Sequence, residues 1–217
     1  DEFQQIGEFT NSLTIQKRLR GVWQHHQNVS YCFFGSKKHL MENIFQSRRM
    51  PFYQFGEMLH LKCIPTEYWV PFICSRFEKY GKKITEGYAS RICQVVKNHS
   101  SYVQQLAWNV MAETEKEVNE QSFKEGLKAL LEQNSSLFIQ QTEGLTTYQL
   151  NFIRLLCKDI HTGFTTKAVS EIYPLGSKSN VDRIKKCLIE KEIITIEKDG
   201  VSLADSVFEL WFKREMM

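Results

Sequence analysis

The sequence predicts a mainly α-helical chain with a small α/β part at its start. Apolar residues recur at helical spacing over most of residues 66–217. A short, β-rich apolar run covers residues 29–34. The chain is globular in composition, because 15 Phe, 8 Tyr and 4 Trp stand beside only 11 Gly and 4 Pro in 217 residues.

Residues 1–65 alternate between helical and extended patterns, which is typical of an α/β unit. The spacing predicts a helix over 8–27 and a buried strand of a parallel sheet over 29–34. Gly35 ends that strand, and Ser36 is expected to cap a helix whose inner face includes Leu40 and Ile44. A second extended piece is expected over 59–64.

Residues 66–142 carry a different pattern, predicted to be a helical bundle with short loops. The periodic segments are 68–80, 84–97, 101–117 and 121–140. The polar stretch 140–144 marks the next boundary.

Residues 143–217 are predicted to form a winged-helix domain. Helices are expected over 146–159, with Thr146 or Thr147 as cap, over 166–173 and over 181–192. Two strands, 193–198 and 201–204, flank Asp199-Gly200, which is a strong hairpin signal. The apolar run 210–212 closes the domain.

Several classes of protein are excluded by composition and spacing. The longest uncharged apolar stretch, residues 29–35, is far below the roughly 20 residues that cross a bilayer. No two of the six cysteines have a C-x₂₋₄-C spacing, and the six histidines lack zinc-binding spacing. Reduced, buried thiols in a cytoplasmic protein are therefore expected.

Two acidic residues open the chain, and a buried strand ending in Gly35-Ser36 follows one helix later. On its own, the pair Asp1-Glu2 is a solvated end, and Ser36 is a helix cap. In this order they match the catalytic edge of a nucleotidase sheet. There, one carboxylate holds Mg²⁺ through water and the other polarises the attacking water.

The chain resembles the archaeal-type AAA+ ATPases, STAND-like P-loop proteins that also occur in bacteria. Five segments carry the resemblance: Asp1-Glu2-Phe3-Gln4, residues 34–41, Pro51-Phe52-Tyr53, residues 99–106 and residues 173–177. The likeness covers the whole chain. It implies the end of a P-loop ATPase core (1–65), a helical lid subdomain (66–142) and a winged helix (143–217).

The resemblance also implies roles for individual residues. Asp1 and Glu2 become the Walker B pair, with Asp1 as the Mg²⁺ residue acting through water and Glu2 as the catalytic carboxylate. Ser36 becomes the sensor-1 residue. His99 takes the place of a nucleotide-sensing residue in the lid, or is an ordinary first residue of a helix.

No G-x-x-x-x-G-K-[ST] sequence occurs anywhere in the chain. That loop cradles the phosphates with its backbone N–H groups and its Lys. The resemblance therefore implies that a P-loop segment precedes Asp1. ATP and Mg²⁺ are expected to bind the full-length parent ATPase, and this chain alone is expected to hold neither tightly and to be inactive.

Residues 15–49 contain seven basic side chains against Glu42 as the single acid, a net charge of +6. Arg48 or Arg49 could act as an arginine finger in an oligomer, compensating transition-state charge. The alternative is a solvated basic face.

The winged-helix domain gives a competing function, that of a non-enzymatic DNA-binding protein. Ser179, Arg183 and Lys186 are the candidate nucleic-acid contacts on its third helix. Residues 141–217 nevertheless carry 11 basic and 11 acidic side chains, so their net charge is zero. Without net positive charge, phosphate attraction is weak, and a protein partner or an autoinhibitory role is the other interpretation.

Overall fold

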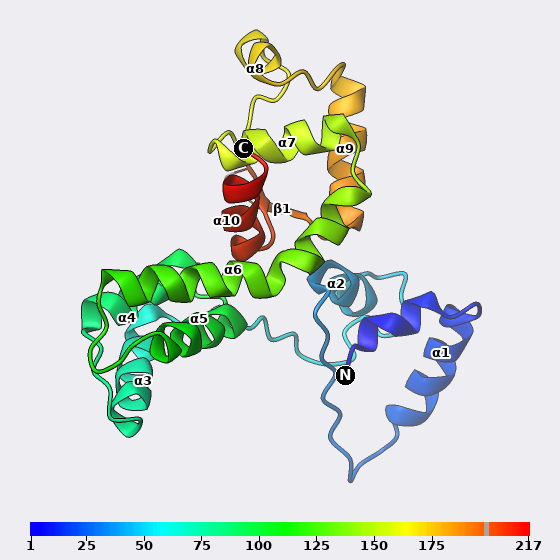
Figure 1. The fold of residues 1–217 in the computed structure, drawn as a ribbon. Coiled ribbons are helices and arrows are strands. Elements are labelled where there is room, and N and C mark those ends of the chain that lie inside the picture. Colours follow the sequence, from blue (N-terminus) through cyan, green and yellow to red (C-terminus); the bar gives the residue numbers. More distant parts are fainter. Residues whose placement is uncertain (198–199) are drawn as a thin grey trace. The chain divides into compact units, whose positions relative to one another are not determined.

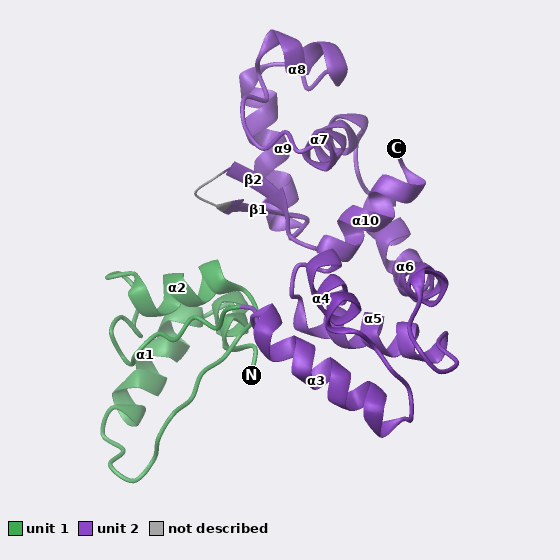
Figure 2. Ribbon diagram, turned by 90° about the vertical axis from the view of Figure 1, so that its left-hand side faces the viewer, with its two compact units in different colours: residues 1–62 green, residues 63–217 purple. Residues whose placement is uncertain are grey.

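The computed structural model describes residues 1–197 and 200–217, and the fold is mainly α-helical, as the sequence predicts (Figure 1). The chain divides into two compact units, residues 1–62 and 63–217 (Figure 2). The predicted boundary at 142/143 lies inside the second unit. No helix of the described residues has the length and apolar character needed to cross a bilayer.

The first unit is built around aromatic rings. It contains the 3₁₀ helix η1 (Phe3–Glu8), α1 (Ser12–Trp23) and α2 (Lys38–Gln46). Phe52 is fully buried between the rings of Phe3 and Phe55, with centroid distances of 5.4 and 5.3 Å. Arg20 on α1 donates to the carbonyl oxygens of Pro51 and Tyr53, which ties this helix to the loop after α2.

The strand predicted over 29–34 does not form, so that prediction is wrong, and the extended piece expected over 59–64 is not part of a strand either. A strand exists only where a neighbouring backbone pairs with it. In the first unit, the 29–34 segment receives a backbone hydrogen bond from Phe3 N to Phe34 O (3.1 Å), which does not extend into a ladder. Leu59 and Leu61 are 81% and 89% exposed, so the second segment is not a buried strand either.

The second unit begins with four helices that correspond to the predicted bundle, with shifted ends (Figure 1). They are α3 (Thr66–Lys79), α4 (Glu86–Val95), α5 (Ser100–Ala112) and α6 (Glu120–Glu143). A capping box between Asn119 and Ser122 fixes the start of α6. α5 and α6 approach closely at Gly126, where an added Cβ would lie 2.7 Å from the backbone nitrogen of Val110.

The rest of the second unit has three helices, a hairpin and a final helix, in the predicted order. These are α7 (Thr147–Cys157), α8 (Lys167–Ile172), α9 (Lys178–Glu190), β1 (Ile194–Glu197), β2 (Gly200–Leu203) and α10 (Ser206–Glu215). The strands pair antiparallel, with Ile194 opposite Leu203. Of the predicted hairpin turn, Asp199 lies outside the described residues. The 210–212 run falls on α10, where Trp211 and Phe212 are buried.

The prediction that all six thiols are buried is confirmed for two of them and wrong for two others. Cys93 and Cys157 are buried, Cys74 and Cys187 are partly buried, and Cys32 and Cys63 are exposed. Cys32 is exposed because it alternates with Tyr31 and Phe33, whose rings stack on Trp23 and on each other. All six are free thiols.

Candidate functional site

The first unit brings Glu2 and Ser36 together, 34 positions apart in sequence. The Ser36 hydroxyl donates to Glu2 Oε2 at 3.1 Å. The backbone bond from Phe3 N to Phe34 O holds the two segments side by side. Ser36 does not cap α2 as predicted, because Lys37 is the N-cap residue and gives no side-chain capping bond. Its hydroxyl points to the acidic pair instead.

A second donor to Glu2 escaped the sequence analysis. The Gln4 amide Nε2 donates to Glu2 Oε2, the same oxygen that accepts from Ser36. Gln4 is only 2% exposed, and its own Oε1 has no hydrogen-bond partner among the described residues. Burying an amide without full hydrogen bonding is costly. The signal available in sequence was the position of Gln4 two residues after Glu2.

Gly35 makes room for that amide. A Cβ at Gly35 would lie 1.8 Å from Gln4 Oε1, so any larger residue would displace the side chain that contacts Glu2. Glu2 itself has left-handed backbone angles (φ 48°, ψ 42°), which non-glycine residues adopt rarely and which concentrate at functional sites. Glu2, Gln4, Gly35 and Ser36 therefore form one small polar cluster.

Asp1 lies at the edge of this cluster and is exposed. Its Oδ1 accepts from the backbone N of Glu2 at 2.8 Å. Carboxylate oxygens are the ligands that Mg²⁺ prefers, so the donor chemistry fits this ion. Three or more His, Cys, Asp or Glu side chains do not converge on a common point within the described residues. A cation here would need oxygens from a phosphate or from water.

A cavity lies beside the cluster, and two segments of the first unit line most of it. Residues 31–36 and 55–62 border this cavity of about 690 Å³. Neither segment belongs to a strand. Backbone that is not paired in a sheet can serve as a template for an added strand.

The other two predicted residues of this unit, Arg48 and Arg49, follow α2 in a turn and are both exposed. No ion pair to a carboxylate is found for either guanidinium among the described residues. The structure places them on the surface and gives them no partner in this unit.

His99 lies in the second unit, at the N-cap position of α5. It is exposed, and its ring packs on Tyr102 with centroids 4.6 Å apart. Tyr102 OH donates to Asp205 Oδ2 at 2.6 Å. Burial, followed by that bond and the negative charge of Asp205, raises the pKa of Tyr102. His99 thus lies next to the hydrogen bond that connects α5 to the start of α10.

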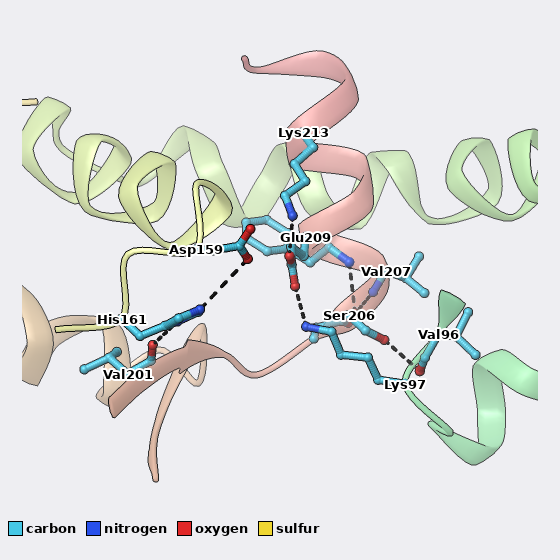
Figure 3. Close-up of polar contacts among 11 residues, drawn as sticks. Val96, Lys97, Asp159, His161, Val201, Ser206, Val207, Glu209 and Lys213 are labelled. Carbon is cyan, nitrogen blue, oxygen red and sulfur yellow. Dashed lines mark hydrogen bonds and ion pairs between the residues drawn. The ribbon is translucent and has the colours of Figure 1, made fainter. Parts of the chain in front are cut away.

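Further side-chain contacts connect the turn before His99 to α10 (Figure 3). Ser206 Oγ donates to the carbonyl of Val96 at 2.9 Å, and Lys97 Nζ donates to Glu209 Oε2 at 2.7 Å. Lys213 donates to the other oxygen of Glu209 at 2.6 Å. The turn between α4 and α5 is therefore tied to α10 by side chains.

The candidate nucleic-acid contacts share one exposed face of α9. Ser179, Arg183 and Lys186 are all exposed and follow one another at spacings of four and three residues. The opposite face buries Val181, Ile184 and Leu188. Arg183 donates to Asn180 Oδ1 at 2.8 Å, and Lys186 lies 4.0 Å from Glu190. The charge of this face is thus partly compensated within the helix.

Comparisons with known proteins give a similarity in structure but none in sequence. Neither a protein-family model nor a curated protein matches the sequence. Among solved structures, the fold is similar to that of the Walker-type ATPase Paby2304 of Pyrococcus abyssi, with a TM-score of 0.74 over 98% of this chain and 13% sequence identity. The chain spans 61% of that ATPase's length. At this identity the likeness establishes a shared fold and assigns no activity to this chain.

Proposed function

We propose that this chain is the C-terminal portion of an AAA+/STAND-like, ATP-hydrolysing switch protein, with Asp1 and Glu2 as its Walker B pair and Ser36 as its sensor-1 residue. The observation that carries the proposal is the hydrogen bond from Ser36 to Glu2 across 34 positions of sequence. The fold shared with a Walker-type ATPase supports it.

The cluster suits the activation of a water molecule. The Ser36 hydroxyl and the Gln4 amide both donate to Glu2 Oε2, so they fix the orientation of the carboxylate. The other oxygen, Oε1, is then available to accept a proton from water, which is the task of a general base. Asp1 supplies an oxygen suited to Mg²⁺, and the bound Mg·ATP would supply the phosphoryl group that the water attacks.

A P-loop segment outside these residues would complete the site. The cavity is bordered by residues 31–36 and 55–62, neither of which belongs to a strand. We assign it to the strand that carries the P-loop, because a strand placed there could pair with both walls. On this proposal the chain alone neither binds ATP tightly nor turns it over. His99 would sense nucleotide in the lid, and Arg48 or Arg49 would act as an arginine finger in an oligomer.

The deciding experiment measures ATP turnover by the protein that contains its P-loop segment. Glu2→Gln is expected to lower kcat about 100-fold or more, since loss of a general base costs about 10²–10⁴, while ATP binding persists. Glu8→Gln is the matched control, because Glu8 is an exposed acid at the end of the same 3₁₀ helix. Unchanged turnover in Glu2→Gln would refute the Walker B assignment.

The second candidate function is duplex DNA binding by a winged helix formed by residues 143–217. The shared exposed face of Ser179, Arg183 and Lys186 favours it. It predicts that the whole chain binds duplex DNA with an affinity that falls steeply as salt rises. The double variant Arg183→Ala, Lys186→Ala should abolish the binding, whereas Lys124→Ala, Lys128→Ala on α6 should not. No binding at low salt would leave a protein partner or an autoinhibitory contact as the role of this face.

A further inference from the structure

A groove of about 570 Å³ lies between α3 and α5 in the second unit, away from His99 and α9. Its exposed rim carries Phe72 from α3, Tyr80 at the C-cap of that helix and Trp108 from α5. Trp108 is 58% exposed and Tyr80 57%, and their rings meet edge to face with centroids 6.3 Å apart. Neither the proposed ATPase site nor the DNA-binding alternative uses this groove.

The helix that forms one wall is unusual in composition. All thirteen residues of α5 are uncharged. Its exposed side presents Ser101, Gln104 and Trp108 at spacings of three and four residues. Solvent-facing helical surfaces of globular proteins are normally rich in charge, whereas the core of a protein interface is depleted of charge and enriched in aromatic residues and Arg.

Arg76 is the basic residue that lines the groove, and no acidic residue among those described lines it with Arg76. Arg76 on α3 is exposed, and its guanidinium lies over the Phe72 ring, 4.9 Å from the centroid. Among the residues that the structure describes, no Asp or Glu lines the groove. Within the described residues, the contacts found for Arg76 include no carboxylate. Residues 76–83 add Lys79, Lys82 and Lys83 against Glu78 alone.

We infer that this groove binds a protein partner through an acidic segment that carries an aromatic or aliphatic anchor. Trp, Tyr and Arg are the residue types that dominate binding energy in protein interfaces, and Trp108, Tyr80 and Arg76 occur together here. The anchor would fill the apolar floor of Ile73 and Phe77, which are buried. A carboxylate beside it would pair with Arg76, as charge complementarity requires. No strand edge lines the groove, so among the described residues the recognition depends on side chains.

Selection from a display library of random 12-residue peptides tests the inference, with the intact chain as bait. The expected peptides are acidic and carry aromatic or aliphatic anchors. One of them, synthesised with a fluorescent label, should lose at least tenfold in affinity for Trp108→Ala. Tyr68→Ala is the matched control, because Tyr68 is a 65% exposed aromatic residue of α3 that does not line the groove. Circular dichroism confirms that each variant is folded.

Charge reversal sharpens the test. Arg76→Glu should reject the acidic peptide and, in a fresh selection, enrich basic ones. The inference is overturned if no peptide is enriched, if enriched peptides lack acidic residues, or if they bind Trp108→Ala as tightly as the wild type. Sedimentation of the chain alone supplies a further check: a dimer that Trp108→Ala dissociates would show that a second copy occupies the groove, and would also overturn it.

Discussion

Lys97 Nζ lies 2.7 Å from Glu209 Oε2, although 112 positions separate the two residues in sequence. Lys97 is in the turn between α4 and α5, and Glu209 is on α10, where Lys213 binds its second oxygen (Figure 3). The Glu209 side chain is only 13% exposed. One carboxylate thus connects the helices of the first half of the second unit to its last helix.

Glu209→Gln is predicted to destabilise the second unit by about 2 kcal/mol, because a hydrogen bond to a charged group contributes roughly 1.5–3 kcal/mol. Both lysines are partly exposed and can be rehydrated, which keeps the loss moderate. Urea unfolding followed by circular dichroism measures it. Glu215→Gln, on the same helix and half exposed, is the control and should change the midpoint little.

The Glu209 carboxylate also predicts how the stability of the second unit changes at acidic pH. Burial by itself raises the pKa of Glu209, but the hydrogen bonds from Lys213 and Lys97 outweigh it, and the pKa is lowered. The stabilisation is therefore present above the unfolded-state pKa of about 4.3 and is lost as the pH falls through the lower folded-state pKa. The difference in stability between wild type and Glu209→Gln should shrink over that acid range. A difference that is independent of pH would contradict the assignment.

Tyr102→Phe is predicted to cost about 1 kcal/mol, the net value of one hydrogen bond, because it removes the donor to Asp205. Asp205 keeps its bonds from the N–H groups of Val207 and Phe208. Burial raises the pKa of Tyr102. This contribution is therefore complete below pH about 10, the unfolded-state pKa, and is lost at more alkaline pH.

Chemical unfolding of the wild type and Tyr102→Phe at pH 7 and pH 11 measures this effect. Tyr68→Phe serves as control, since Tyr68 is 65% exposed. Equal stability of Tyr102→Phe and wild type at pH 7 would show that the hydroxyl contributes nothing.

Gly126→Ala is predicted to destabilise the second unit by about 1–3 kcal/mol, the usual cost of overpacking. The new Cβ would lie 2.7 Å from Val110 N and Cγ2, so α5 and α6 would have to separate. Gly87→Ala makes the same chemical change on α4, where the nearest atom to the new Cβ is 3.7 Å away. That variant should be neutral or up to about 1 kcal/mol more stable. The reverse order of thermal midpoints would refute the close approach.

The sequence predicted most helices because their signals are local. Thr146 and Gln149 form a capping box, and the apolar spacing of α9 places Val181, Ile184 and Leu188 inside. The order of three helices and a hairpin followed from such signals. Helix ends shifted by a few residues, because caps and turns such as Lys97-Asn98, both with positive φ, depend on packing against α10.

Features that depend on distant residues were missed or predicted wrongly. The β-rich composition of 29–34 favours a strand, but pairing requires a second backbone that local sequence cannot supply. Ser36 looked like a helix cap because its competing partner, Glu2, is 34 positions away. Gln4 was overlooked because a glutamine near a chain start carries no periodic signal. Trp108 follows helical spacing, and only the structure shows that it faces solvent.

Gly35→Ala tests the polar cluster around Glu2. The added Cβ would lie 1.8 Å from Gln4 Oε1 and 3.2 Å from Met41 Sδ, so the Gln4 amide must leave its buried position. Glu2 would then lose one of its two donors. We expect the first unit to be destabilised by about 1 kcal/mol, the value of one hydrogen bond, with faster amide hydrogen exchange confined to residues 1–62 and unchanged exchange in residues 63–217.

Gly7→Ala is the matched control, because nothing lies within 4 Å of its added Cβ in the same unit. Gln4→Leu in the Gly35→Ala background separates the two causes of the effect. If the clash with the amide is responsible, Gly35→Ala should add little once Gln4 is already replaced, since coupled residues are not additive. A full additive loss in the double variant would show that Gly35→Ala does not act through a clash with the Gln4 amide.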